Sequence, residues 1–181
     1  IDDFNQNHAL VKKGLAVMPV CFGISFTKTF LNQGSSLVHV YTDGTVNVTT
    51  GGVEMGQGVS SNMVSLVCHT FGIPAEKVHW NSTNTFRIAN VSPSAASATT
   101  DLNGNATLIA CREIRKSLLA FAAENLNGKP ESLHLREGFL FQDGEATDWS
   151  WEKLVQEGYL HRAQLMAHGF YTAPENPFDG S

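Results

Sequence analysis

Residues 37–72 read LVHVYTDGTVNVTTGGVEMGQGVSSNMVSLVCHTFG, and this stretch decides the fold. Apolar and polar residues alternate on both sides of Asp43-Gly44, a dipeptide that favours a type I′ turn, so residues 37–50 are predicted to form a β-hairpin. From Val59 onward, apolar residues recur at helical spacing until Gly72 and Pro74 stop the run. The stretch therefore predicts a hairpin, a glycine-rich loop and a helix, in that order.

Strands and helices alternate over the rest of the chain. The pattern predicts an amphipathic opening over 4–15, a strand over 78–81, a long helix from Asp101 or Leu102 to about Asn125, a second hairpin over 133–141 with a turn at Asp143-Gly144, a helix over 151–157 capped by Ser150, and a last strand over 163–171. The fold class is therefore α+β, with β-hairpins and a mixed sheet packed against two main helices. Subdomains are expected at about 1–125 and 130–181.

Composition excludes several classes of function. The net charge of −5 has the wrong sign for a nucleic-acid-binding domain. No apolar stretch approaches the roughly 20 residues that span a bilayer, and no signal peptide is present, so we expect no membrane partner and a cytoplasmic protein. Cys21, Cys68 and Cys111 are far apart without CxxC spacing, which favours reduced thiols and no metal held directly by this chain. Because the sequence opens without Met, we expect an internal segment of a longer protein.

The run Gly51-Gly52-Val53-Glu54-Met55-Gly56-Gln57-Gly58 has four glycines in eight residues. It lies between a predicted strand and the start of a predicted helix. Glycine lets a backbone approach a ligand closely, and a helix N-terminus offers unpaired N–H groups that favour an anion. The run matches neither the P-loop nor the GxGxxG fingerprint, so a tight structural turn is the alternative.

Two further runs have competing interpretations. Residues 92–100, SPSAASATT, either line a surface that a bulky ligand approaches or form a Ser/Thr-rich capping loop. Residues 22–27, FGISFT, are typical of a core strand when taken alone. Neither run decides between structure and binding by its pattern.

Together and in order, several motifs resemble the xanthine dehydrogenase and aldehyde oxidase family. They are FGISFT at 22–27, FLNQ at 30–33, LVHVYTDGTV at 37–46, GGVEMGQG at 51–58, STNT at 82–85, AAS at 95–97 and DLNG at 101–104. Within that family, PSAAS and FGISFT resemble the purine-oxidising branch. The resemblance implies the C-terminal half of a molybdenum-cofactor-binding domain.

The resemblance also implies roles for individual residues. Residues implied to hold the molybdopterin cofactor are Met55, Gly56, Gln57, Gly58, Ala95, Ala96 and Ser97. Phe26 and Thr27 are implied to contact the purine substrate, which replaces the core-strand interpretation of 22–27. The family's glutamate base belongs to a GVGE-type motif that these 181 residues lack, so no catalytic residue is assigned within the chain.

The family's other groups imply further partners for this chain. FAD and 2Fe-2S clusters are implied in other domains or subunits, since no cysteine array for iron–sulfur clusters is present. We expect contacts with the rest of the molybdenum domain and with those domains, a possible homodimer, and no activity from the chain alone. An aldehyde oxidase-type hydroxylase and a non-catalytic binding or assembly module remain the alternatives.

Overall fold

The computed structural model describes residues 1–19, 24–95 and 97–174 of the chain. In chain order its main elements are α1 (Asp2–Asn7), β1 (Gln33–Val40), β2 (Val46–Thr50), α2 (Val59–Phe71), β3 (Val78–Asn81), α3 (Ala98–Asn125), β4 (Leu133–Arg136), β5 (Phe139–Gln142), β6 (Glu145–Ser150), α4 (Trp151–Leu160) and β7 (Met166–Thr172). No helix within these residues is long and apolar enough to cross a bilayer.

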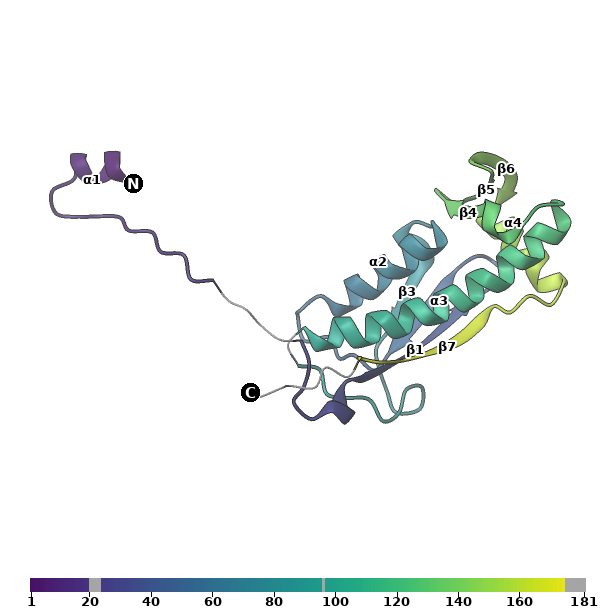
Figure 1. Cartoon of the computed structure of the whole chain (residues 1–181), viewed down its shortest axis with the longest axis horizontal. Coiled ribbons are helices and arrows are strands. Elements are labelled where there is room, and N and C mark those ends of the chain that lie inside the picture. The colour runs from purple at the N-terminus through teal and green to yellow at the C-terminus, as the bar shows by residue number, and fades with distance from the viewer. Residues whose placement is uncertain (20–23, 96, 175–181) are drawn as a thin grey trace.

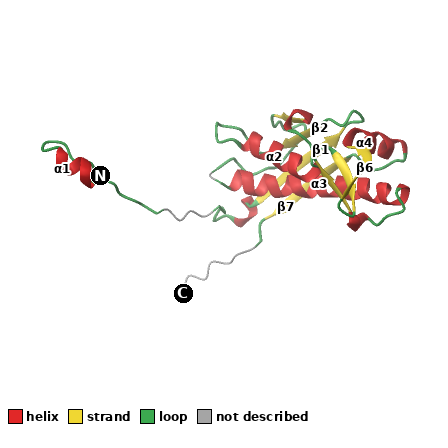
Figure 2. Ribbon diagram, turned by 90° about the horizontal axis from the view of Figure 1, so that it is seen from above, coloured by secondary structure: helices red, strands yellow, loops and turns green. Residues whose placement is uncertain are grey.

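The main sheet is mixed and has the strand order β3-β2-β1-β7, and a second sheet has the order β4-β5-β6. Strand β1 runs antiparallel to both β2 and β7, while β2 and β3 are parallel and are joined through α2. Helices α2 and α3 lie side by side over the main sheet (Figures 1 and 2). The predicted α+β class is confirmed, and so are the two main helices.

The first hairpin and the helix after it are confirmed, but the turn type is different. Of Asp43 and Gly44 only Gly44 has a positive φ, +83°, whereas a type I′ turn requires both. Tyr41 accepts a hydrogen bond from the Gly44 N–H at 2.8 Å and donates its own N–H to the Thr45 carbonyl at 2.9 Å. The connection is thus a three-residue loop. The type I′ pattern occurs instead at Asp143 and Gly144, where φ is +50° and +91°.

Other sequence predictions need correction. The amphipathic opening forms a helix only over α1, and residues beyond it such as Leu10 and Leu15 are 98% and 81% exposed because nothing packs against them. The second hairpin is a three-stranded meander, since Glu137 and Gly138 turn the chain before β5. Helix α3 begins at Ala98, earlier than predicted. Helix α4 and its cap are confirmed, with the Ser150 hydroxyl accepting the Lys153 N–H at 3.2 Å.

The C-terminal part of the chain is built into the same core as the N-terminal part. Strand β7 pairs with β1, and Trp151 of α4 is 1% exposed. The Trp151 indole N–H donates to the Gly44 carbonyl at 2.7 Å, and its ring lies 5.1 Å from that of Phe71. The two expected subdomains therefore share one sheet in this structure, and the division into subdomains remains a prediction.

Helix α3 lies unusually close to the main sheet. A Cβ atom built at Gly169 of β7 would lie 1.9 Å from the Ala106 carbonyl oxygen, and one at Gly34 of β1 would lie 2.8 Å from the Leu102 carbonyl oxygen. The buried Thr107 hydroxyl also donates to Ser36 Oγ at 2.9 Å. Glycine at these strand positions thus allows the α3 backbone to pack directly against the main sheet.

Replacing Gly169 with alanine should destabilise the chain, because the added methyl group meets the α3 backbone rather than a movable side chain. We expect Gly169→Ala to lower the free energy of unfolding by about 3 kcal/mol, measured by urea denaturation. Gly14→Ala is the control, since its Cβ would meet nothing within 4 Å, and it should change stability by less than about 0.5 kcal/mol. Equal effects of the two substitutions would contradict this account of the packing.

Candidate functional site

The loop at 51–58 joins β2 to α2, and its four glycines divide into two pairs. A Cβ atom at Gly51 would lie 2.3 Å from the side chain of Val91, and one at Gly52 would lie 2.9 Å from that of Thr99. Gly56 and Gly58 have φ values of +97° and +80°, and a Cβ at either would meet nothing within 4 Å. The first pair permits close packing within the protein, and the second permits a left-handed backbone beside open space.

The carboxylate of Glu54 caps the start of α2. Oε1 accepts the N–H groups of Gly56 and Gly58 at 2.8 and 3.1 Å, and Oε2 accepts both the N–H and the hydroxyl of Ser60 at 2.9 Å. A carboxylate at a helix N-terminus is favoured by the helix dipole as well as by these bonds. The sequence predicted unpaired N–H groups at this helix start. In the structure, Glu54 accepts hydrogen bonds from the N–H groups of Gly56, Gly58 and Ser60.

These hydrogen bonds stabilise the charged form of Glu54. Those from the backbone N–H groups of Ser60 and Gly58 contribute most, and together with the Ser60 hydroxyl they lower the pKa of Glu54 from 4.5 to about 2. The side chain is therefore a fixed negative charge at neutral pH. An anionic ligand group at the same N–H groups would have to displace it.

Gln57 folds its side chain back onto the loop. Its Oε1 accepts the Met55 N–H at 2.5 Å, and its Nε2 donates to the Val53 carbonyl at 2.8 Å. The amide thus satisfies two backbone groups that the tight turn leaves free. The Met55 side chain, by contrast, is 64% exposed. Gln57 holds the loop's shape while Met55 projects from it.

The chain around the start of α3 is fastened to this loop and to α2. The Ser94 hydroxyl accepts the Val53 N–H at 2.7 Å, and the Asn62 amide donates to the Thr100 hydroxyl at 3.2 Å. Ala95 is half-buried, Ser97 is exposed at the N-cap of α3, and Ala96 lies outside the described residues. Two runs that are far apart in the sequence are therefore held side by side.

An open hollow of about 760 Å³ lies where the two runs meet. Its walls are formed by Met55 and Gln57 from the loop, Ser97, Thr100 and Asp101 from the start of α3, Asn62 from α2, and Ile24. The volume is within the range of about 300–1,000 Å³ that is typical of small-molecule sites. The structure thus brings together Met55, Gln57 and Ser97, three of the predicted cofactor residues.

The hollow's polar groups suit a ligand with both donors and acceptors. Amides and hydroxyls offer hydrogen bonds of either direction, and the Asp101 carboxylate accepts donors only. Behind the wall, Thr99 Oγ1 and Asn103 Oδ1 are buried without a hydrogen-bond partner among the described residues. Because the one charged side chain in its wall, Asp101, is acidic, the hollow fits the hydrogen-bonding edge of a heterocycle better than a phosphate group.

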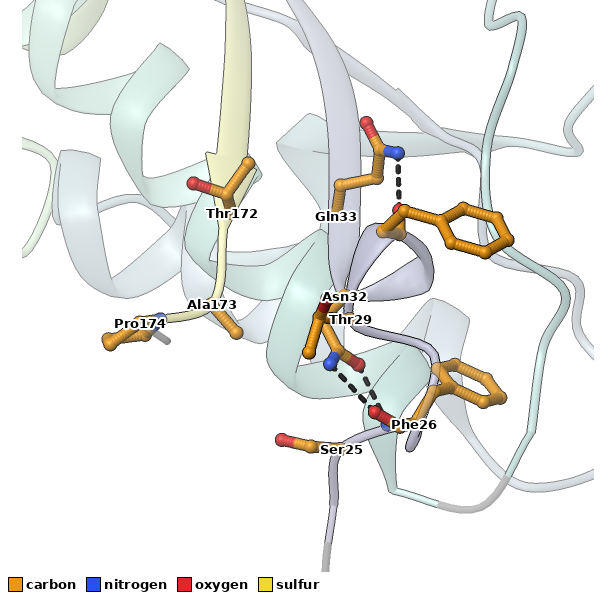
Figure 3. Close-up of a pocket in the computed structure, with 9 residues that line it drawn as sticks. Ser25, Phe26, Thr29, Asn32, Gln33, Thr172, Ala173 and Pro174 are labelled. Carbon is orange, nitrogen blue, oxygen red and sulfur yellow. Dashed lines mark hydrogen bonds between the residues drawn. The ribbon is translucent and has the colours of Figure 1, made fainter. Parts of the chain in front are cut away.

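Phe26 lies at a different hollow, of about 460 Å³, together with Thr29, Gln33 and Thr172 (Figure 3). It is half-buried, and Thr27 is exposed and lines neither hollow. Residues 24–28 form no strand, so the core-strand interpretation of FGISFT is wrong for its described part; Phe22 and Gly23 lie outside the described residues. The predicted substrate residue Phe26 and the predicted cofactor residues therefore line two different hollows. The hollows are neighbours, because Ile24 lines one and Phe26 lines the other.

Sequence reasoning missed the residues that support the site. Glu54 receives no role from the sequence, because a capping box has its Glu three residues after the N-cap, whereas Glu54 lies four residues before the N-cap Gly58. Ser94 and Asn62 act through contacts distant in sequence, which no local pattern contains. The site's supporting hydrogen bonds become visible only in the folded chain.

Thiols and metal ligands do not build a site here. Among the described residues, no group of three or more His, Cys, Asp or Glu side chains is arranged to hold a metal ion. Burial raises the pKa of the Cys111 thiol to about 12 and also raises that of Cys68, so both stay protonated at neutral pH. Cys21 lies outside the described residues.

The fold and the hollow define a class, that of an α+β domain with an open hollow of small-molecule size beside a glycine-rich loop. Comparison with known families makes this specific: the model described as molybdopterin cofactor-binding domain matches residues 1–181. The chain belongs to the molybdopterin cofactor-binding domain family.

Relatives agree with this assignment. The xanthine dehydrogenase/oxidase of Mus musculus is 42% identical over 96% of this chain and 12% of its own length. The xanthine dehydrogenase of Oryza sativa subsp. japonica is 41% identical over 98% of this chain and 11% of its own length. The chain thus spans about an eighth of these relatives, and the predicted likeness to xanthine dehydrogenases is confirmed.

Solved structures share the fold at low sequence identity. CO dehydrogenase from Oligotropha carboxidovorans superposes with a TM-score of 0.70 and 22% identity, over 78% of this chain and 18% of that one. Quinoline 2-oxidoreductase from Pseudomonas putida 86 gives a TM-score of 0.69 and 20% identity, over 77% of this chain and 19% of that one. The two structures support the fold and carry no argument about substrate.

The Glu54 cap makes stability depend on pH. Because folding lowers this pKa, the stabilisation is complete above about pH 4.5 and is lost as the pH falls toward about 2. We expect Glu54→Gln to lower the unfolding temperature at pH 7, and we expect the difference from wild type to narrow between pH 4.5 and pH 2. Circular dichroism melts across this range provide the measurement.

Glu113→Gln is the matched control, since the Glu113 side chain is exposed on α3 and has no hydrogen bond or ion pair among the described residues. It should leave the unfolding temperature near that of wild type at every pH. A Glu54→Gln deficit that stays constant down to pH 2 would contradict the capping role.

Proposed function

We propose that this chain is part of the molybdenum domain of a xanthine dehydrogenase, an enzyme that hydroxylates hypoxanthine and xanthine to urate. The observation that carries the proposal is the hollow shared by Met55, Gln57 and Ser97, because it unites the two runs that resemble the family's cofactor contacts. Relatives at about 40% identity are named xanthine dehydrogenases, which favours purine as the substrate class.

The residues around the hollow have distinct proposed roles. Gln57 fixes the loop's shape, Met55 and Ser97 contact the cofactor, and Gly56 and Gly58 leave room for it. Ala95 and Ala96 complete the surface as small side chains. Glu54 keeps the N–H groups at the α2 start in place, and it is not proposed as a base, because its pKa of about 2 leaves it too weak to take a proton.

Chemistry and substrate contact are divided between this chain and others. When bound, molybdopterin supplies the metal centre that hydroxylates an electron-poor ring carbon. Phe26 is proposed to contact the flat face of the purine, and Thr27 to make a polar contact to it. The general base is proposed to belong to another segment of the parent, since no GVGE-type motif occurs in these residues.

The proposal includes partners and location. The parent is proposed to carry the remainder of the molybdenum domain together with FAD and 2Fe-2S domains or subunits, to work in the cytoplasm, and to form a homodimer. The isolated chain is proposed to be inactive. An aldehyde oxidase-type hydroxylase would use the same hollow with another substrate, and a non-catalytic module would retain the fold without metal.

Replacing Gln57 with alanine in the full-length parent should weaken cofactor binding. Two hydrogen bonds of the loop are lost, each contributing about 1 kcal/mol, which together correspond to a cofactor affinity weakened by more than about tenfold. We expect molybdenum content and the rate of xanthine oxidation to fall together by about tenfold. Metal analysis and an absorbance assay for urate measure the two quantities.

Gln164→Ala is the control, because the exposed Gln164 side-chain amide donates to the Met166 carbonyl, has no other hydrogen bond among the described residues, and does not line the hollow. It should retain molybdenum and activity. A wild-type parent that contains molybdenum and oxidises aldehydes but not purines would favour the aldehyde oxidase alternative, and one that holds no molybdenum would favour the binding module.

A further inference from the structure

The chain enters β1 through a segment, residues 24–31, that has no strand partners of its own among the described residues. A 3-10 turn at Thr29–Leu31 reverses its direction just before Asn32. Asn32 is 8% exposed and forms part of the wall of the 460 Å³ hollow that also contains Phe26 (Figure 3). A buried amide at such a junction requires hydrogen-bond partners.

The Asn32 side chain holds both backbone groups of Phe26. Its Oδ1 accepts the Phe26 N–H at 2.8 Å, and its Nδ2 donates to the Phe26 carbonyl at 3.0 Å, as the two dashed lines in Figure 3 mark. A carboxamide presents the same donor and acceptor as a peptide group, so the side chain replaces the neighbouring strand that this segment lacks. Phe26 is thereby fixed at its backbone rather than through its ring.

The backbone of Asn32 is itself held by the sheet. Its carbonyl accepts the Ala173 N–H at 2.9 Å, its N–H donates to the Thr29 carbonyl at 2.9 Å, and the next residue, Gln33, pairs with Thr172. The Leu31 carbonyl also accepts a hydrogen bond from the Ser92 hydroxyl, in the loop that leads to Ser97. Asn32 therefore transmits the position of the β1–β7 pair to Phe26.

We propose that Asn32 is a positioning residue that fixes Phe26 against a planar substrate ring. The inference rests on the proposed function, which assigns Phe26 to the purine pocket, and it adds a group that acts through Phe26 without touching the substrate. Alanine at this position offers neither bond. Aspartate keeps the acceptor for the Phe26 N–H but sets a second oxygen against the Phe26 carbonyl, so both substitutions should release the segment.

Hydrogen exchange in the full-length parent tests the clamp without reference to activity. In Asn32→Ala and in Asn32→Asp, we expect deuterium uptake in peptides covering residues 24–31 to accelerate at least about tenfold. Asn125→Ala is the matched control, because the Asn125 side chain lies at the exposed end of α3, donates to the Phe121 carbonyl at 2.9 Å, and lines neither hollow. It should leave that uptake unchanged. Unchanged uptake in both Asn32 variants would overturn the proposal.

A double-mutant cycle with Phe26 tests whether the clamp serves the substrate. With molybdenum content unchanged, we expect Asn32→Ala to lower kcat/KM for xanthine by about 10- to 100-fold, because small misplacements of a positioning group are costly. In a Phe26→Ala background, the same substitution should add less than about twofold, since its effect passes through Phe26. The Asn125→Ala variant should match wild type in both backgrounds.

The outcomes separate this inference from the proposed function. Additive effects of the two substitutions, or an Asn32→Ala variant as active as Asn125→Ala, would overturn the positioning role while leaving purine oxidation in place. A wild-type parent that oxidises no purine would overturn the proposed function and the substrate role of the clamp together. The exchange result then decides whether Asn32 fixes Phe26 at all.

Discussion

The structure depends on how closely α3 approaches the backbones of β1 and β7. Gly34 and Gly169 have no side chains that would hold the helix away from the sheet. The buried hydrogen bond between Thr107 and Ser36 also fixes the helix along the strand. Because a rigid helix transmits its placement along its length, this contact also determines where Ser97, Thr100 and Asp101 lie. The candidate site is therefore positioned by backbone packing at a distance from it, and the loop at 51–58 closes against a wall that is already fixed.

Within that loop, Glu54 provides the negative charge at the helix start and Gln57 maintains the shape of the turn. Glu54 accepts the N–H groups that a helix start would offer to an anion, while Gln57 accepts the Met55 N–H and donates to the Val53 carbonyl. The loop is thus internally satisfied before any ligand arrives, which lowers the ordering cost of binding. What remains for a ligand is the open space beside Gly56 and Gly58, the exposed Met55 side chain, and the hydroxyls of α3.

Local pattern was sufficient to predict the hairpin, helices α2 and α4 and strand β3, because each has its periodicity and its stop signals in one short stretch. Local pattern was insufficient where a residue distant in sequence determines the local structure. The Asp43-Gly44 turn is held by Trp151, and α3 starts early because Thr99 is buried beside Gly52. The FGISFT run has strand-forming residues, yet Asn32 satisfies Phe26 from the side chain, so no strand forms there. The resemblance to a known family predicted that Met55, Gln57 and Ser97 belong to one site. It did not predict the hydrogen bonds of Glu54, Ser94 and Asn62 that hold this site together.

The pairing of β1 with β7 has a consequence for how the chain reaches its native state. These strands lie near opposite ends of the described fold, so their ladder forms only after nearly all of the intervening residues have left the ribosome. Until then β1 presents a free edge, with alternating apolar side chains, to any extended segment nearby. Loop-closure entropy opposes so distant a contact, which makes it a late and slow step of folding. The nascent chain is consequently prone to aggregate until β7 pairs with β1. A chaperone that covers the free edge of β1 would protect the chain during this time.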